Sequence, residues 1–290
     1  MTKQAYYKYD EERQVKELAI ESFIVEYVKG VRQEDPGLGG NKLWLMYRKE
    51  FDHDYAVGHN KFAVIISRNG LNIRQRRRKV PRTTDSDHDL PKYPNLVRHL
   101  LATRAGQIIV SDITYQGIVQ KDGTIKFCFI HIVTDAYTHQ ILACVVSDTL
   151  KAKHSVKALK IALKSLSDCN PGIHPYHHSD RGVQYASGAY TKLLKANGYQ
   201  ISMTESGNPK DNAIAERVNG ILKNELLAGR VFHSRQELEK AVGQAVDFYN
   251  NKRPHMSNNM LTPMEARKCE GVLEKKWKCF RDKYLTPIVA

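Results

Sequence analysis

The stretch Gln107-Ile108-Ile109-Val110-Ser111-Asp112 opens the part of the chain that decides the fold. Its apolar, β-branched run predicts a buried strand over Gln107–Ser111 that ends at Asp112. Further strands are predicted at 125–134, 140–146, 173–178 and 200–204, with helical stripes before the last two of them. Three strands in succession, followed by alternating helices and strands, predict an α/β fold with a mixed sheet.

Three carboxylates stand at prominent places in this pattern. Asp112 closes the first apolar run, Asp180 closes the run 173–179, and Glu216 lies in the helical stretch 211–219. From 180 to 216 is 36 positions, so 35 residues separate the last two acids. Such acids can hold a pair of Mg²⁺ ions, the equipment for cutting and joining phosphodiester bonds. Taken singly, each has a plainer explanation as a turn residue, an Asx turn or a solvent-facing helix residue.

The neighbours of Glu216 favour the functional interpretation. At helical spacing, Asn212, Asn219 and Lys223 share its face. Lys223 lies two turns on, roughly 10 Å along the helix axis, where a cation could hold a DNA phosphate. The alternative is an ordinary amphipathic helix with a polar outer face.

Composition indicates the class of partner. The 290 residues carry a net charge of +14, which favours a polyanion such as nucleic acid over a merely solvated basic surface. The five cysteines contain no CxxC pair, which argues for reduced thiols rather than disulfides or zinc. The chain begins with no signal-type apolar core, and its longest apolar stretch, 127–133, is too short to span a bilayer. We therefore expect a cytoplasmic protein with no membrane partner.

The first part of the chain is predicted to be helical. Asp10 can cap a first helix, a second follows Gly39-Gly40-Asn41, and a third runs over 59–68. The inward residues expected for these three helices are, in order, Val15, Leu18 and Ala19; Leu43, Met46 and Tyr47; and Phe62, Ile65 and Ile66. Short helices joined by glycine-containing turns are compatible with a helix-turn-helix. A basic run follows, and we expect it to contact DNA phosphates through Arg74, Arg76, Arg77 and Arg78.

These features divide the chain into four parts. A helical DNA-binding module spans 1–82, and a polar linker with two prolines spans 83–106. The catalytic domain with its C-terminal helices spans 107–268, and a basic tail spans 269–290. Within the catalytic domain, Ser234-x-x-Glu237 predicts a capping box at the start of a long helix.

Four segments together resemble bacterial insertion-sequence transposases with a retroviral-integrase-type core. They are SDITY at 111–115, HSDRGVQY at 178–185, SGNPKDNAIAE at 206–216 with Lys223 seven residues on, and FYNNKRPH at 248–255 followed by Thr262-Pro263. Their order and the 35-residue gap also match that family. The resemblance covers about 30–268 and is closest to the second-frame (OrfB-type) protein of the two-frame group.

The resemblance implies an RNase H-like fold. Asp112 would lie on the first strand, Asp180 after the fourth and Glu216 on the following helix, together binding Mg²⁺ or Mn²⁺, with two ions expected. It implies cleavage at the inverted repeats that end the element, and attack of the freed 3′-hydroxyl on target DNA. It also implies an oligomer assembled on DNA in the nucleoid. The region Gly39–Arg78 resembles the family's helix-turn-helix segment, and an upstream frame supplies a further DNA-binding protein.

Two positions depart from the family pattern. Ile109 stands where the family usually has tryptophan, and Arg217 stands where serine usually follows the glutamate. Arg217 therefore offers a further DNA contact, and neither change touches the three acids.

Three further residues near the acids and two other functions are alternatives to consider. Asp135 is expected to cap a turn rather than bind metal, and His178 to orient its loop or contact DNA. Metal ligation by His177 is disfavoured because no Cys/His spacing follows. The alternative functions are a non-catalytic DNA-binding regulator derived from a mobile element and a general RNase H-like nuclease.

Overall fold

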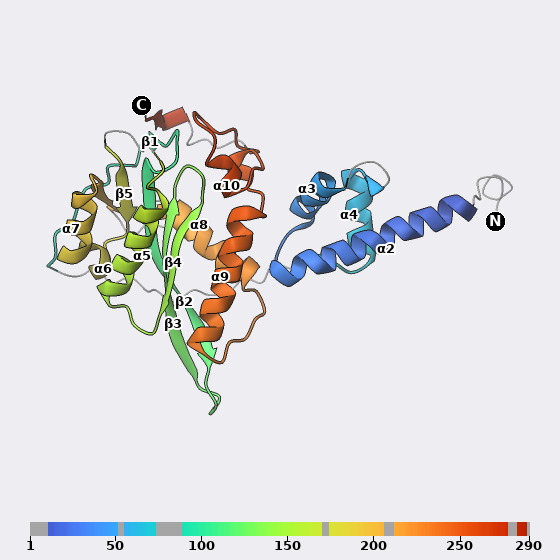
Figure 1. Ribbon diagram of the computed structural model, residues 1–290, viewed down its shortest axis with the longest axis horizontal. Helices are drawn as coiled ribbons and strands as arrows, with labels where there is room; N and C mark the ends of the chain where they lie inside the picture. The colour runs from blue at the N-terminus through green and yellow to red at the C-terminus, as the bar shows by residue number, and fades with distance from the viewer. Residues whose placement is uncertain are drawn as a thin grey trace. The chain divides into compact units, whose positions relative to one another are not determined.

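The computed structural model describes residues 11–51, 55–73, 89–169, 174–205, 212–277 and 283–288. The chain divides into two compact units, Met1–Arg78 and Lys79–Ala290 (Figure 1). The expected phosphate contacts of Arg74, Arg76, Arg77 and Arg78 fall outside the described residues. In the part of the chain that is described, no helix is long and apolar enough to cross a membrane.

The described residues of the first unit form three helices, α2 (Glu11–Glu34), α3 (Gly40–Glu50) and α4 (His59–Arg68). Its core confirms the inward residues Leu43 and Tyr47 of α3 and the inward residues of α4, which are Phe62, Ile65 and Ile66.

The expected inward face of α2 is wrong. Val15 and Leu18 are 62% and 63% exposed, and the buried side of α2 is formed instead by Ile20, Ile24 and Val28. The physical reason is that only part of the helix is covered by the rest of the unit. Residues 12–19 are all exposed, and the first buried residue of α2 is Ile20. A periodic pattern marks an apolar face but does not show how much of the helix is covered.

The second unit is built on a five-stranded sheet in the order β4-β3-β2-β5-β6. The strands are β2 (Ile108–Val119), β3 (Ile125–Asp135), β4 (Ile141–Ser147), β5 (Tyr176–Ser179) and β6 (Gln200–Met203). β3 is antiparallel to both of its neighbours, whereas β5 is parallel to β2 and β6 is parallel to β5. This mixed sheet with flanking helices confirms the expected RNase H-like core.

Alternate residues of β2 enter two separate cores. Ile109 packs with side chains of α5 (Ala152–Ser165) and of α7 (Gly188–Ala196), the latter following the short helix α6 (Val183–Ala186). Ile108 and Val110 pack instead with Ala215 of α8 (Ala213–Ile221). Because successive strand residues point to opposite faces, α5 and α7 cover one face of the sheet and α8 covers the other.

β2 does not end at Asp112 as the apolar run predicts. It continues for seven more residues to Val119 and pairs with β3 from Ile109↔Asp135 to Val119↔Ile125. The sequence beyond Asp112 is mixed in polarity, so the partner strand rather than the apolar run decides where this strand ends. Asp112 therefore lies inside a long hairpin that extends past the core (Figure 1).

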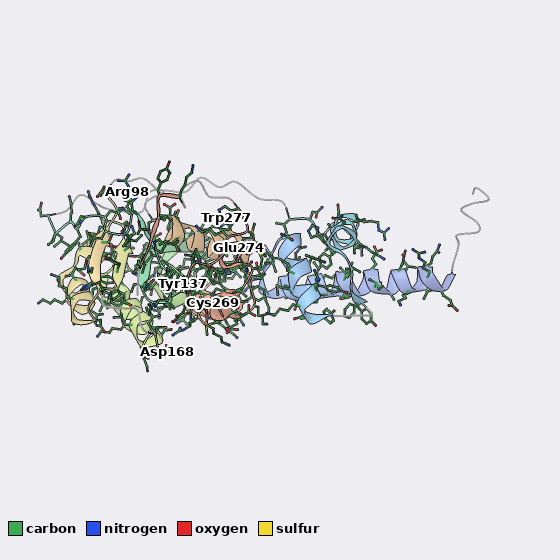
Figure 2. The ribbon with its side chains drawn as sticks, turned by 90° about the horizontal axis from the view of Figure 1, so that it is seen from above. Arg98, Tyr137, Asp168, Cys269, Glu274 and Trp277 are labelled. Atoms are coloured by element: carbon green, nitrogen blue, oxygen red, sulfur yellow. The ribbon has the colours of Figure 1, made fainter. Side chains whose placement is uncertain are left out.

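The end of the second unit packs back on the sheet. α9 (Arg235–Asn251) begins at Ser234, whose hydroxyl accepts from the Glu237 main-chain N–H, while the Glu237 carboxylate accepts from the N–H of His233. The π-turn η3 (Leu222–Leu226) precedes α9, and η4 (Met256–Asn258) and α10 (Pro263–Ala266) follow it. After α10, Arg267 donates to the Gln140 side chain, to the Ser165 carbonyl and to the Asp168 carboxylate, labelled in Figure 2.

Both segments expected as linker and tail contain a strand. β1 (Leu100–Leu101) pairs in parallel with β7 (Thr286–Pro287), and Thr103 donates through its hydroxyl to the Ile288 carbonyl. Ala102 and Ala105 are buried. The described part of 83–106 therefore belongs to the second unit, where it pairs with the far end of the chain.

Candidate active site

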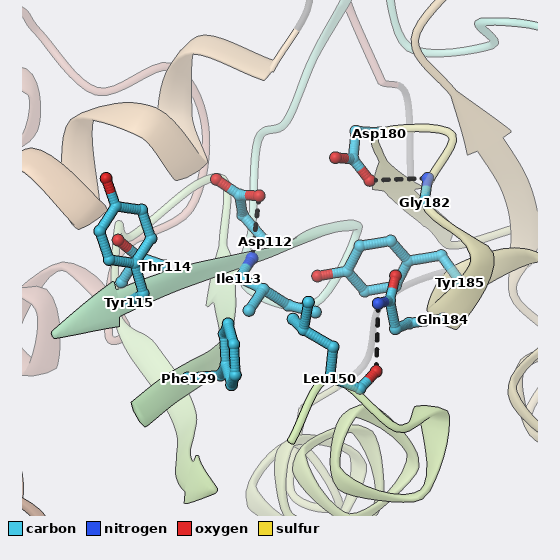
Figure 3. Close-up of a pocket in the computed structure, with 10 residues that line it drawn as sticks. All are labelled: Asp112, Ile113, Thr114, Tyr115, Phe129, Leu150, Asp180, Gly182, Gln184 and Tyr185. Atoms are coloured by element: carbon cyan, nitrogen blue, oxygen red, sulfur yellow. Dashed lines mark hydrogen bonds between the residues drawn. The ribbon is translucent and has the colours of Figure 1, made fainter. Parts of the chain in front are cut away.

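The register of two parallel strands places Asp112 beside Asp180. Ser111 of β2 lies opposite Ser179 of β5, and the two aspartates are the next residues along each chain. Neighbouring strands lie about 4.8 Å apart, so residues that follow a register pair remain close. Figure 3 shows both carboxylates facing one hollow, which is also lined by Thr114, Tyr115 and Tyr185.

The Asp112 carboxylate is held at both oxygens. Oδ1 accepts from the main-chain N–H of Ile113 at 2.9 Å, and Oδ2 accepts from Asn219 Nδ2 at 2.6 Å. Asn219 lies on α8, the helix that carries Glu216. The side chain of Asp112 is thus fixed by its own strand and by α8.

The Asp180 carboxylate is held by the loop that follows β5. Its Oδ1 accepts from the main-chain N–H of Gly182 at 3.0 Å (Figure 3). A Cβ atom at position 182 would lie 3.0 Å from this oxygen and 2.9 Å from the side-chain oxygen of Gln184. A side chain here would therefore crowd the Asp180 carboxylate, although the φ of −65° at position 182 is open to any residue.

Proximity of the acids changes their protonation. Burial, followed by the negative charge of Asp180, raises the pKa of Asp112 to about 8, and the charge of Glu216 adds to this effect. Tyr185 is buried beside the pair, and burial together with the charges of Asp112 and Asp180 raises its pKa well above the ordinary value. The site therefore concentrates negative charge that a cation would relieve.

The donor set of the hollow fits a hard divalent cation. Asp112 and Asp180 offer carboxylate oxygens, which are the ligands that Mg²⁺ and Mn²⁺ prefer. Burial and repulsion by Asp180 raise the pKa of Asp112, and a bound cation would oppose both effects by favouring the charged carboxylate.

Glu216 lies on the helix next to the pair but does not line the hollow. Its side chain is exposed, and desolvation by the surrounding protein raises its pKa. Within the described ranges, no group of three or more His, Cys, Asp and Glu side chains could hold a metal ion. The structure thus brings Asp112 and Asp180 together. Glu216 lies outside the hollow but close enough for its charge to raise the pKa of Asp112.

The side chains of Asn212 and Asn219 form hydrogen bonds within the protein. Both are buried, Asn212 donates to the Ser111 carbonyl at 3.3 Å, and Asn219 donates to Asp112. The DNA contacts expected of them from a shared helix face are thus replaced by bonds to β2. Helical spacing groups residues on one side of a helix, but the sheet packed against α8 decides which of them are covered.

Lys223 approaches the hollow from the π-turn. It lies on η3, directly after α8, and its ammonium group stands 4.2 Å from the ring centre of Tyr115. Tyr115 lines the hollow, so the lysine reaches the wall of the site through this ring. Arg217, the other expected DNA contact on this part of the chain, is exposed on α8.

The π-turn is tied to the segment after α9 by a largely buried ion pair that the sequence motifs did not predict. Arg253 donates through Nε and Nη2 to the two carboxylate oxygens of Glu225 at 2.7 and 2.8 Å. The Arg253 side chain is 2% exposed, and its guanidinium also lies by the Tyr249 ring. One turn earlier, Asn250 bonds both the N–H and the C=O of Ile141 on β4. The FYNNKRPH segment therefore joins the sheet to the turn that carries Lys223.

The two histidines before Asp180 are buried supports. His177 Nε2 lies 2.9 Å from both the Ser111 and the Tyr190 hydroxyls, and burial lowers the pKa of His177 to about 3. His178 Nδ1 lies 2.8 Å from the Ser202 hydroxyl and joins β5 to β6. With 1% of its surface exposed, His178 does not offer the DNA contact considered for it.

Asp135 closes the turn after β3. Its carboxylate accepts from the N–H groups of Gly106 and Thr138 and from the Thr138 hydroxyl, at 2.7 to 2.8 Å. These contacts occupy both oxygens, as expected for a turn cap.

Comparison with known proteins shows which protein family this chain is similar to. Models described as the integrase core domain match residues 102–209 and 197–263. An uncharacterized 31 kDa protein of insertion element IS600 from Shigella sonnei is 33% identical over 213 residues, covering 73% of this chain and 75% of that protein. The transposase for insertion sequence element IS629 from Shigella sonnei is 31% identical over 230 residues, covering 79% and 73%. Among solved structures, the HTLV-2 integrase catalytic core domain in complex with magnesium matches with a TM-score of 0.43 at 16% identity, covering 57% of this chain and 97% of that one.

Proposed function

Because the chain belongs to the insertion-sequence transposases with an integrase core domain, we propose that Asp112, Asp180 and Glu216 carry its chemistry. The protein is a DDE-type transposase, and its reaction is DNA transposition. We assign it metal-dependent cleavage at the element ends, followed by transfer of the freed 3′-end to target DNA.

The observation that carries the assignment is the register of Ser111 with Ser179, which places Asp112 beside Asp180. Two neighbouring carboxylates, one within β2 and one directly after β5, with the pKa of Asp112 raised to about 8, form a site that favours a cation. Asp112, Asp180 and Glu216 would hold two divalent ions, which would supply charge stabilisation for the attacking and leaving oxygens of phosphodiester exchange. Glu216 completes the set when DNA is bound, since catalytic geometry often tightens only in the complex.

The remaining residues of the site position these groups. Asn219 and the Ile113 N–H orient Asp112, and the Gly182 N–H orients Asp180. Lys223, held by the Tyr115 ring, contacts a DNA phosphate near the cleaved bond. Arg217 and the arginines at 74 and 76–78 contribute further phosphate contacts.

Cleavage of a duplex that carries the element's terminal repeats tests this assignment. In Mg²⁺, the Asp180→Asn variant should lose 3′-end cleavage and strand transfer by about 1,000-fold, because a ligand worth several kcal/mol of charge stabilisation is gone. Asp247→Asn, on the exposed side of α9, is the matched control and should retain both activities.

Other outcomes separate the alternatives. Full activity of Asp180→Asn contradicts the site. Cutting without end specificity or joining indicates a general nuclease, and metal-independent DNA binding with no cleavage under any condition indicates a regulator.

We propose that the protein works as an oligomer on DNA and pairs with the product of an upstream frame. Support for the second protein comes only from the two-frame group that the chain resembles. Co-expression of both frames followed by co-purification on an end-containing duplex tests it, and recovery of this chain alone at full activity contradicts it.

A further inference from the structure

A row of lysines covers the exposed side of α5. Lys153, Lys157, Lys160 and Lys164 follow one another at spacings of four, three and four residues, so they share one helical face. Lys151, at the N-cap, extends the row, and all five side chains are exposed. The helix contains no acidic residue.

The row is not balanced by neighbouring acids. Asp148, just before the helix, pairs with Lys126 and Arg235, and Asp168, just after it, pairs with Arg267. Among the described residues, none of the five lysines forms an ion pair with an acid. Like charges three and four residues apart repel, and lysines at a helix N-terminus oppose the helix dipole. The arrangement therefore weakens the helix, and a bound polyanion would reverse that effect.

The row begins at the active site. Leu150 lines the hollow beside Asp112 and Asp180, and its carbonyl accepts from the Gln184 side chain at 3.1 Å (Figure 3). α5 starts two residues later and packs on β3 and β4, with α6 and α7 beside it. The lysine face thus leads away from the two aspartates along one side of the sheet.

We propose that this lysine face binds the phosphate backbone of duplex DNA that flanks the bond being cut. From Lys153 to Lys164 is 11 residues, or roughly 16 Å of helix. Duplex DNA carries one negative charge per about 1.7 Å of axis, so a segment of that length offers each lysine a phosphate. The proposal rests on the proposed function, which puts the bond to be cut in the hollow.

The chemistry of the face favours DNA over an acidic protein. A protein partner is usually anchored by buried aromatic or large apolar side chains, and the only large apolar residue exposed on α5 is Ile161. Lysines are flexible point charges that contact phosphates without reading sequence. This face therefore holds flanking DNA of any sequence and leaves recognition of the ends to other parts of the chain.

The test is the salt dependence of DNA binding. The variant with Lys153→Gln, Lys157→Gln and Lys160→Gln is compared with a control that carries Lys121→Gln, Lys240→Gln and Lys268→Gln. The control lysines are also exposed, form no ion pair with a described acid and lie outside α5, in the β2–β3 turn, on α9 and after α10, so both variants lose the same charge. Equal thermal midpoints show that the folds are intact.

We measure the slope of log binding constant against log salt concentration on an end-containing duplex with long flanks. In the α5 variant this slope should be less negative than in the parent by about 2 to 3. The control should flatten it by less than about 1 unit. In cleavage assays the α5 variant should raise KM and leave kcat near that of the parent, and shortening the flanks should remove the difference. Equal slopes for the two variants would overturn the proposal.

The outcomes keep the two proposals apart. If the parent cleaves DNA but the α5 variant keeps the full slope, the lysine face is wrong and the transposase site stands. If no metal-dependent cleavage occurs but the slope changes only in the α5 variant, the face binds DNA and the assigned catalytic site fails. If polyglutamate binds the parent as tightly as the duplex does, and the α5 variant loses both to the same extent, the partner is an acidic chain rather than DNA.

Discussion

At the scale of single residues, the site depends on one main-chain amide. The N–H of Gly182 holds Asp180, and a methyl group at this position would crowd the Asp180 carboxylate and the Gln184 side chain. Position 182 is therefore sensitive to the smallest substitution, although it has no side chain to offer the substrate.

Gly182→Ala should lower the cleavage rate by up to about 10-fold, because its Cβ would push the Asp180 carboxylate by a few tenths of an ångström and a misplacement of about 1 Å costs about 100-fold. The melting temperature should change little, since φ at 182 suits alanine. Gly188→Ala, where an added Cβ meets nothing within 4 Å, is the control for cleavage and for melting. Activity of Gly182→Ala within twofold of the parent would show that Asp180 has room to move.

At the scale of helices and turns, the position of Lys223 depends on the pair of Arg253 and Glu225. Removing one partner of a buried ion pair leaves the other charge without compensation. Arg253→Met should therefore lower the free energy of unfolding by about 3–5 kcal/mol. Adding Glu225→Met should recover most of that loss, because two apolar side chains of similar size replace the pair. Urea unfolding of the parent, both single variants and the double variant measures this, and a double variant no more stable than Arg253→Met contradicts it.

The sequence predicts much of the arrangement of strands and helices, but there are physical reasons why it does not predict certain contacts between them. The five strands, the place of Asp112 on the first and of Asp180 after the fourth follow from apolar runs and from the resemblance. The parallel register of Ser111 with Ser179 does not, since it is set by pairing between segments more than sixty residues apart. Nor does the bond from Asn219 to Asp112, because helical spacing alone does not show which face meets the sheet. The π-turn carries no local signal and is held by Arg253, which lies 28 residues beyond Glu225.

At the scale of the whole molecule, three histidines make folding depend on pH. Burial lowers the pKa of His131 and His139 to about 4 and that of His177 to about 3. Each is protonated more readily in the unfolded chain, so its contribution to stability is complete above about pH 6.5 and is lost as pH falls toward the folded pKa.

Each histidine should therefore lower the free energy of unfolding between pH 6.5 and 4 by up to about 1.4 kcal/mol per pH unit, whereas Asp112, with its raised pKa, changes it in the opposite direction. His131→Gln removes one contribution, and its urea midpoint should change less steeply with pH than that of the parent. Gln keeps a polar group near the Ser147 and Ser155 hydroxyls, which His131 contacts. Parallel pH profiles for the parent and the variant would contradict the assignment to His131.

The four-residue strand β5 restricts where insertions and deletions can occur during evolution. Side chains alternate along a strand, so gaining or losing one codon within Tyr176–Ser179 would turn Asp180 to the other side of the sheet relative to Asp112. A codon added in the turn between β3 and β4, or in the loop after β2, would leave that pairing unchanged. Length variation among descendants should therefore gather in the connections and stay out of β5.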